Sequence, residues 1–375
     1  MFRNNDHARL ILVTTVNVAV LIWAAEPAWG ANMNGESLPA TRRINIALQG
    51  GGSHGAFSWG VLDGLLEDGR IEIDGISGTS AGAVNATVLG YGLASYGREG
   101  ARRALEIFWR EIANLARLSP VQPSWLDRMT GWHTINLSAA WLVFDHLTRF
   151  FSPYELNPCN LNPVRDILLK MVDFELLRNC RNPKLFLCAT NVLSGRIRVF
   201  TNQDIGVSAV LASSCLPHLF QAVKIDGEYY WDGGYMGNPP IYPLIYQTDT
   251  SDVLIIRINP IRIPEVPTTA REILDRVNTL SFNSSLMREM RAIDFVTRLI
   301  DEGALDPARY RRMFIHNIDA EPEMVRLSAS SKFNADWAFL RELFALGRQR
   351  ASEWLAANFD ALGRRSSIDI VETFL

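Results

Sequence analysis

Two kinds of hydrophobic pattern alternate along the chain after residue 43. Compact apolar runs typical of strands cover residues 44–48 and 71–76, and a glycine-rich turn follows each of them. Apolar or small residues then recur at helical spacing over 56–66 and 83–89. This order of strand, loop, helix, strand, turn and helix is typical of an α/β fold with a mainly parallel sheet, so we predict that fold class.

The rest of the chain continues the mixture of strands and helices. Strand patterns recur at 184–191, 196–200, 221–225, 252–259 and 313–318, and helical patterns recur at 270–300 and 337–359. The chain contains no internal repeat and no low-complexity tract. We therefore predict one α/β domain over residues 44–245 and a mixed, largely helical C-terminal extension over 246–375 that packs on it.

The first 30 residues have the pattern of a targeting segment. Basic residues, including Arg3 and Arg9, precede an apolar run over 10–25, and small residues follow at 28–30. The run is shorter than the roughly 20 residues that span a bilayer. A cleaved signal peptide is therefore favoured over an N-terminal membrane anchor, with a disordered or core-packed leader as the third alternative. Residues 31–43 would be a linker, and the domain would be exported to the periplasm or secreted.

Composition excludes several classes of protein. The chain has 37 Lys+Arg and 40 Asp+Glu, a net charge of −3, which argues against nucleic acid as a partner. Hydrophobic residues make up 48% of the chain, so the bulk of it is not disordered. No EF-hand or His-Glu-x-x-His pattern is present, so neither a metal nor a cofactor is expected, and the oligomeric state stays open.

The four cysteines are not spaced as a metal site. Cys188 falls in a strand pattern and Cys215 in a stretch of small residues, so both are expected to be buried free thiols. Cys159 and Cys180 flank a helical pattern and could be bridged in an oxidising compartment.

A Gly-Thr-Ser-Ala-Gly pentapeptide at 78–82 lies between a predicted strand and a predicted helix. This is the context of a nucleophile elbow. Gly78 and Gly82 permit a sharp turn that a Cβ atom would obstruct, and the turn presents the Ser80 hydroxyl at the helix N-terminus. The pattern predicts that Ser80 is a nucleophile, although a loop can produce the same pentapeptide by chance.

The glycine-rich loop at 50–55 has two competing interpretations. It matches Gly-x-Gly-x-x-Gly, and Asp74 lies near the position of the ribose-binding acid of a dinucleotide site. However, that acid should end the second strand, whereas here the strand continues beyond Asp74. The second interpretation is that consecutive glycines leave backbone N–H groups exposed beside Ser80, where they can bind an oxyanion.

A third candidate is the Asp-Gly-Gly sequence formed by Asp232, Gly233 and Gly234, which follows a pair of predicted strands. Taken alone, Asp-Gly is typical of a hairpin turn. Its combination with the two glycine-rich motifs favours a catalytic role for Asp232 over a simple hairpin turn.

Together these segments resemble the patatin-like phospholipase family, in particular bacterial patatin-like lipid acyl hydrolases. The resemblance covers residues 44 to about 245 and includes Ala212-Ser213-Ser214 and Asn238-Pro239. It implies a three-layer sandwich around the parallel sheet, a lipid or acyl-ester substrate and a membrane surface as partner. It also implies Ser80 as nucleophile and Asp232 as proton acceptor. The implied oxyanion hole comprises Gly50, Gly51, Gly52, Ser53, His54 and Gly55.

The implied reaction is hydrolysis of a carboxylic ester, of the phospholipase A or lysophospholipase type, through an acyl-enzyme and a Ser-Asp dyad. His54 departs from the family, which most often has Arg or Lys there, so charge support to the loop is expected to depend on pH. Two alternatives stay open. One is an α/β-hydrolase triad of Ser80, Asp232 and His316, and the other is a nucleotide-binding module built on the 50–55 loop.

The segment from Trp125 to Phe151 is rich in aromatic residues. We expect it to be an acyl-chain pocket, a lid or an interfacial surface, because a lipid substrate must leave an aggregate for an apolar channel. The alternative is that these residues belong to the core.

Overall fold

The computed structural model describes residues 41–119, 121–124, 127 and 133–375, and these residues form one compact unit. The segment 1–30 and most of the proposed linker 31–43 lie outside the described residues. The boundary between 245 and 246 falls inside the compact unit.

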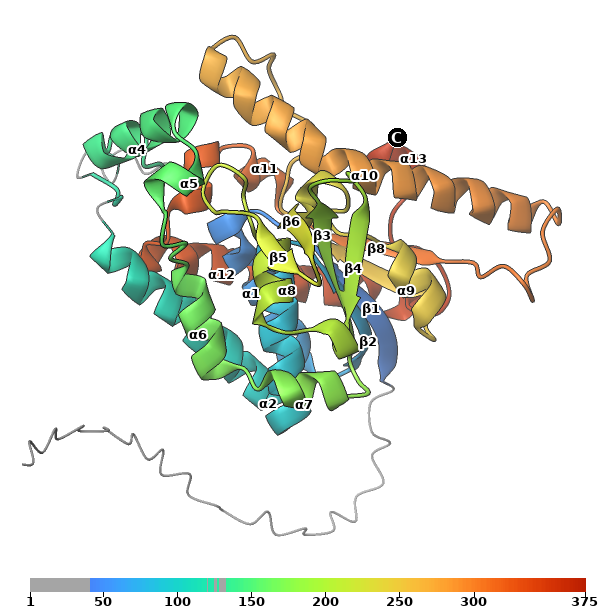
Figure 1. Cartoon of the computed structure of the whole chain (residues 1–375). Helices are drawn as coiled ribbons and strands as arrows, with labels where there is room; N and C mark the ends of the chain where they lie inside the picture. The colour runs from blue at the N-terminus through green and yellow to red at the C-terminus, as the bar shows by residue number, and fades with distance from the viewer. Residues whose placement is uncertain (1–40, 120, 125–126, 128–132) are drawn as a thin grey trace, which may run out of the picture. The chain divides into compact units, whose positions relative to one another are not determined.

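One mainly parallel, mixed sheet forms the centre of this unit, as predicted (Figure 1). Its order is β5-β6-β3-β2-β1-β7-β8, with β4 paired to β3. The pairs among β3, β2, β1, β7 and β8 are parallel, whereas β4 and β6 run antiparallel to β3. The strands are β1 (Arg42–Leu48), β2 (Ile71–Gly78), β3 (Lys184–Asn191), β4 (Ile197–Thr201), β5 (Val223–Ile225), β6 (Glu228–Asp232), β7 (Asp252–Ile256) and β8 (Phe314–Ile318).

Helices cover both faces of the sheet, which confirms the three-layer sandwich (Figure 1). Alternate side chains of β1 divide between the faces: Ile46 and Leu48 join one core and Ala47 joins the other. The first core is closed by α1 (Gly55–Asp68), α2 (Ala81–Leu118) and α12 (Trp337–Asn358). The second core is closed by α9 (Tyr242–Gln247), α10 (Ala270–Asp301) and α13 (Ile370–Phe374).

The C-terminal region is part of this sandwich rather than a separate layer. β7 pairs directly with β1, and α12 packs against α1. Gly60 and Gly347 let these two helices approach closely, because a Cβ atom at either glycine would overlap with the backbone of the other helix.

Shorter elements connect these layers. The helices are α4 (Ala139–Phe150), α5 (Pro153–Leu156), α6 (Pro163–Met171), α7 (Phe174–Asn179), α8 (Val207–Ser213) and α11 (Glu321–Met324). The 3-10 turns are η1 (Gly52–His54), η2 (Asn202–Asp204), η3 (Gly233–Tyr235), η4 (Ala329–Phe333) and η5 (Phe359–Ala361).

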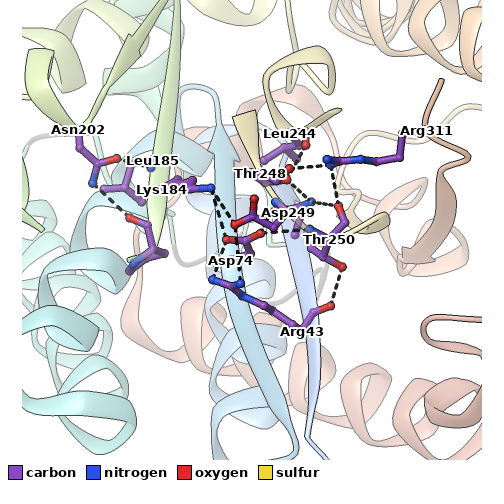
Figure 2. Close-up of polar contacts among 12 residues, drawn as sticks. Arg43, Asp74, Lys184, Leu185, Asn202, Leu244, Thr248, Asp249, Thr250 and Arg311 are labelled. Atoms are coloured by element: carbon purple, nitrogen blue, oxygen red, sulfur yellow. Dashed lines mark hydrogen bonds and ion pairs between the residues drawn. The ribbon is translucent and has the colours of Figure 1, made fainter. Parts of the chain in front are cut away.

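A buried carboxylate joins the amino ends of the central strands (Figure 2). Asp74 of β2 is fully buried, and its Oδ1 lies 3.1 Å from Arg43 of β1 and 3.9 Å from Lys184 of β3. Its Oδ2 accepts hydrogen bonds from the backbone N–H groups of Asp249 and Thr250, at 2.7 and 3.2 Å, just before β7. One side chain thus connects four neighbouring strands at the end of the sheet opposite the glycine-rich loop.

All four cysteines are free thiols, so the Cys159–Cys180 bridge does not form in this structure. Cys188 and Cys215 are buried, as predicted. In the part of the chain that the structure describes, every helix is too short or too polar to cross a bilayer.

The aromatic segment divides between core and surface. Trp125 and Trp132 lie outside the described residues. Trp141 is buried against Phe333, with 5.2 Å between ring centroids, whereas Phe150 is 74% exposed. The core interpretation therefore holds for Trp141 and the surface interpretation for Phe150.

Candidate active site

Ser80 occupies a strained turn between β2 and α2. Its φ is 56° and its ψ is −124°, in the half of the φ range that residues with a side chain rarely adopt. A Cβ atom on Gly78 would overlap with Gly82, and one on Gly82 would overlap with the Leu48 carbonyl of β1. Both glycines are therefore required for the turn, which presents Ser80 at the first turn of α2.

Asp232 ends β6 and lies in the same site. Its backbone N–H donates to the Cys215 carbonyl and its backbone carbonyl accepts from the Thr190 hydroxyl, each at 2.8 Å. Its side chain is fully buried, and Oδ1 accepts the Gly234 N–H at 2.8 Å. Oδ2 has no hydrogen bond of regular geometry with a described residue.

The surroundings of Asp232 change its acidity. Burial raises its pKa from 3.8 to about 7, and hydrogen bonds from the Gly234 N–H and the Ser80 hydroxyl oppose this rise. The Ser80 hydroxyl thus lies within the interaction range of the carboxyl group. The structure brings together the two residues that the sequence singled out.

The glycine-rich loop packs against the serine turn. An added Cβ on Gly50 would lie 2.6 Å from the Cβ of Ser80 and 2.7 Å from the Thr79 carbonyl oxygen. The Gly50 N–H donates to Asn238 Oδ1 at 2.7 Å. By contrast, the amides of Gly51, Gly52 and Ser53 donate to none of the described residues. These three N–H groups are therefore unpaired within the part of the chain that the structure describes.

Three polar residues, Thr79, Ser213 and Asn238, fix the positions of the serine turn, the glycine-rich loop and the segment after Asp232. The Ser80 N–H donates to the carbonyl and the hydroxyl oxygen of Ser213, at 3.1 and 3.2 Å, so this amide is already occupied. The Thr79 hydroxyl donates to the Gly237 carbonyl at 2.6 Å, which links the serine turn to the segment after Asp232. Ser213 and Asn238 lie in motifs that the sequence had indicated, but their positioning roles depend on contacts that no motif predicts.

His54 does not carry the charge that the sequence suggested. It is buried, and its Nε2 lies 2.7 Å from the Ser331 hydroxyl, which itself donates to the Ser328 carbonyl. Burial, assisted by the nearby Lys332 ammonium, lowers the pKa of His54 from 6.5 to about 3. The expectation of a pH-dependent positive charge here was wrong, because the imidazole stays neutral at physiological pH.

The alternative triad is not assembled. His316 is buried in β8, where its Nε2 lies 3.0 Å from Asp252 Oδ1 and its ring meets Trp354 edge-on. β6, which carries Asp232, and β8 are separated by β3, β2, β1 and β7 in the sheet. At about 4.8 Å per strand, His316 and Asp232 lie roughly 24 Å apart across the sheet. His316 is a structural residue.

The nucleotide-binding alternative also loses its acidic partner. Asp74 points to the amino ends of the strands, where Arg43, Lys184 and two backbone N–H groups surround its carboxylate (Figure 2). The glycine-rich loop follows the carboxyl end of β1. Asp74 therefore cannot contact a ribose bound at that loop.

The location of the site follows from the strand order. The chain proceeds from β1 through β2 to β3 on one side and adds β7 and β8 on the other, so the order reverses between β1 and β7. Ligands of open α/β sheets bind at the carboxyl ends of the strands beside such a reversal. The fold and the site define an α/β protein with a serine on a strand–helix turn, a buried carboxyl partner and a loop of free amides.

Comparison with known families is consistent with this class. The family model described as patatin-like phospholipase matches residues 46–245, which is more than half of the chain. The chain belongs to the patatin-like phospholipase family, and membership implies lipid acyl hydrolase activity. No curated protein sequence matches the chain.

Two of the solved structures that are similar to this chain are those of VipD and of the ExoU–SpcU complex. The structure of VipD from Legionella pneumophila is 16% identical with a TM-score of 0.41, and the match covers 87% of this chain and 72% of that one. The ExoU–SpcU complex from the type III secretion system of Pseudomonas aeruginosa is matched at 18% identity with a TM-score of 0.29. That match covers 89% of this chain and 65% of that one, so this chain spans about two thirds of its length.

Proposed function

We propose that this protein is a serine lipid acyl hydrolase that cleaves carboxylic esters through an acyl-enzyme and a Ser80–Asp232 dyad. The observation that carries the proposal is the pairing of a serine in a strained turn with a fully buried carboxyl group whose pKa lies near 7. The amides of Gly51, Gly52 and Ser53 are the proposed oxyanion donors, since the Ser80 amide is occupied by Ser213.

In the first half-reaction the Ser80 hydroxyl attacks the ester carbonyl and its proton passes to Asp232. The carbonyl oxygen becomes an oxyanion that the loop amides stabilise. As the tetrahedral intermediate collapses, Asp232 returns the proton to the leaving alcohol, and the acyl group stays on Ser80. In the second half-reaction Asp232 takes a proton from water as the water oxygen attacks the acyl carbonyl. When the tetrahedral intermediate collapses, the bond to Ser80 Oγ breaks, Asp232 returns the proton to Oγ, and the fatty acid leaves.

The raised pKa of Asp232 makes it a better base than a free aspartate. A carboxylate with a pKa of 3.9 has little affinity for a proton from serine, whereas a pKa of about 7 matches a neutral working pH. Because the carboxyl is buried and the Ser80 hydroxyl lies within its interaction range, no imidazole is needed between them.

Site-directed substitution tests the dyad. Ser80→Ala and Asp232→Asn should each abolish the hydrolysis of a soluble short-chain ester, although both variants fold. His316→Ala should retain most of the activity, if the protein folds as well as the wild type. Full activity of Asp232→Asn would refute the dyad.

The substrate class can be assigned by product analysis. Phospholipase A or lysophospholipase action would release free fatty acid and a lysophospholipid or a glycerophosphodiester from a mixed lipid extract, and Ser80→Ala would release neither. Release of fatty acid from neutral lipids alone would assign the activity to another acyl ester.

A membrane surface is the proposed source of substrate. On α4, the apolar side chains of Leu142, Val143, Leu147 and Phe150 are exposed, and α10 exposes Ile273, Leu274, Val277 and Leu280. α4 approaches the glycine-rich loop through η4, because Trp141 packs on Phe333. Exposed apolar surface next to a lipid site is suited to contact with a bilayer.

Vesicle binding tests this surface. Phe150→Asp should weaken binding to phosphatidylcholine vesicles by roughly tenfold to a hundredfold, because a buried aromatic side chain contributes roughly 1.5–3 kcal/mol. Hydrolysis of a soluble ester should not change. Tyr246→Asp, at an exposed aromatic residue of α9, is the matched control and should bind like the wild type. Equal binding of Phe150→Asp and the wild type would remove α4 from the interface.

Export from the cytoplasm stays part of this proposal. An N-terminus beginning after residue 30, found by peptide sequencing of protein from the periplasm or the medium, would support a cleaved signal peptide. Recovery of the intact chain in the membrane fraction would support the anchor.

A further inference from the structure

The glycine-rich loop carries no positive side chain of its own at neutral pH. Its ionisable residue, His54, is buried and hydrogen-bonded to Ser331, and its pKa of about 3 keeps it neutral. An oxyanion held by this loop would therefore rely on backbone dipoles alone, unless a cation from another part of the chain lies close by.

Such a cation lies on η4, far downstream in the sequence. His54 and Ser331 are 277 residues apart, yet their side chains lie 2.7 Å from each other. The next residue, Lys332, has its carbonyl oxygen against the loop, where a Cβ atom on Gly52 would overlap with it. Gly52 has a φ of 58°, so both its conformation and its neighbour exclude a side chain. The η4 turn is thus fitted directly onto the loop.

The Lys332 ammonium reaches the loop through one intermediate residue. Its Nζ donates to Asn259 Oδ1 at 2.9 Å, and Asn259 Nδ2 donates to the Gly50 carbonyl at 2.8 Å. Asn259 follows β7, and its backbone N–H and side-chain amide also donate to Gln49 Oε1 at 3.0 and 3.2 Å. The amide group of Asn259 is therefore held in a single orientation.

The geometry of the peptide bond links this chain to the oxyanion. The Gly50 carbonyl and the Gly51 N–H belong to one planar trans peptide group, so they point in opposite directions. A hydrogen bond to the carbonyl strengthens the dipole of that group and makes the N–H a better donor. A positive charge on the far side of Asn259 increases the effect, because Asn259 becomes a stronger donor.

We propose that Lys332 is a positioning residue of the oxyanion loop, which acts through Asn259 and the Gly50–Gly51 peptide to strengthen the Gly51 N–H as a donor. The inference rests on the proposed function. It assigns to the C-terminal region the positive charge that the loop lacks. The Lys332 side chain itself is not a catalytic residue, since it acts through Asn259.

Several charged and titratable groups face Lys332 from the elements packed around it. Burial lowers the pKa of Lys332 below its usual value, and the Asp275 carboxylate of α10 opposes this shift by attracting the ammonium. Asp275 is also influenced by Arg271 on its own helix and by Asp145 of α4. His54, the titratable neighbour on η1, stays neutral and does not compete.

Four variants test the proposal with a soluble short-chain ester. Lys332→Met removes the charge and keeps the stem, Lys332→Gln is a second uncharged variant, Lys332→Arg keeps the charge, and Lys170→Met on the exposed surface of α6 is the matched control. We expect kcat to fall about tenfold in the two uncharged variants with KM within twofold of the wild type. This is less than the 10²–10³-fold loss on removing an oxyanion donor outright. Lys332→Arg should restore kcat to within threefold, and Lys170→Met should match the wild type.

A double substitution tests the route through Asn259. If Lys332 acts through it, Lys332→Met should cause no further loss of kcat when added to Asn259→Ala. Full additivity, a loss confined to KM, kcat within twofold of the wild type in both uncharged variants, or an arginine variant no better than methionine would each overturn the proposal.

The outcome for the wild type separates the two hypotheses. Ser80-dependent hydrolysis that is insensitive to Lys332 would overturn this inference alone. Absence of Ser80-dependent hydrolysis would overturn the proposed function and, with it, this inference.

Discussion

Replacing Asp232 by asparagine should stabilise the folded protein at neutral pH while it abolishes hydrolysis. The carboxyl group is fully buried at the end of β6, and burial raises its pKa from 3.8 to about 7. Asparagine has nearly the same shape and keeps an oxygen that can accept the Gly234 N–H, which Asp232 Oδ1 accepts at 2.8 Å. The substitution therefore removes the ionisation and leaves the local hydrogen bond.

The magnitude follows from the two pKa values. Below pH 3.8 the carboxyl is protonated in both the folded and the unfolded chain, and its contribution to stability is fully present. Between pH 3.8 and about 7 the unfolded chain releases the proton and the folded protein keeps it, so stability falls as pH rises. Three pKa units correspond to about 4 kcal/mol, and the loss levels off above pH 7.

Urea unfolding of both proteins between pH 4 and pH 8 measures this difference. All other titrating groups are shared, so they cancel when the free energies of unfolding are subtracted. We expect the stability of Asp232→Asn relative to the wild type to increase by about 4 kcal/mol from pH 4 to pH 8. Asp166→Asn, at an exposed position on α6, is the matched control and should show a nearly constant difference.

The activity of the wild type should follow the same titration. Because only the ionised carboxylate accepts a proton, kcat/KM should rise with pH and reach a plateau above a midpoint near 7. A stability difference that stays constant within about 1 kcal/mol over the whole range would refute the reasoning. It would mean that Asp232 does not bind its proton more tightly in the folded state.

Three further predictions concern the loop and the sheet. Gly50→Ala should reduce hydrolysis at least a hundredfold, because its Cβ would lie 2.6 Å from that of Ser80, whereas Gly206→Ala, with open space around it, should be nearly neutral in the same rate assay. His54→Gln should leave the midpoint of the pH–rate profile within 0.3 of a pH unit, on the order of measurement error, because the histidine is already neutral and the titration belongs to Asp232. Asp74→Asn should lower the free energy of unfolding by about 2–3 kcal/mol in urea titration, since it weakens buried charge-assisted hydrogen bonds, and a change below 0.5 kcal/mol, well under that expected range, would contradict this role.

Local patterns were sufficient to predict most of the sheet and the position of the serine turn. The strand at 184–191 was predicted with the bounds that β3 has, and the glycine-flanked serine turn lies where the pentapeptide placed it. Such features depend on short sequence separations, where apolar periodicity and glycine conformation decide the structure. The helix after Ser80 was predicted to cover 83–89, but α2 continues to Leu118 with a kink at Tyr96 and Gly97.

Glycines on either side of the kink explain how α2 bends at this point. Gly92 and Gly100 weaken a helix in isolation by roughly 1 kcal/mol each relative to alanine. In the structure, Gly92 lies against the backbone at Ala101, and Gly100 lies against Tyr96, so the two halves of α2 approach closely at the kink. Residues that break a helical pattern in the sequence therefore mark the kink at which the two helical halves of α2 meet.

The contribution of η4 could not be predicted for a different reason. The segment around Lys332 is short and polar, with no periodicity and no motif, and its contact with His54 spans 277 residues. The same contact buries the imidazole and lowers its pKa, which is why the expectation for His54 failed. Burial and long-range contacts are properties of the assembled fold, and a lone histidine in a sequence carries no information about either.

These features together suggest how the site distinguishes the ground state from the transition state. In the proposed reaction the negative charge begins on Asp232 and ends on the substrate oxygen, so its amount is constant and only its position changes. Burial makes the negative charge on Asp232 unfavourable, which is also why it raises the pKa of this residue. In the proposed reaction the unpaired amides of the loop, polarised by Lys332 through Asn259, make the negative charge on the substrate oxygen favourable. Interactions that favour the transition state over the ground state are the ones that accelerate a reaction, and here both ends of the charge shift act in the same direction.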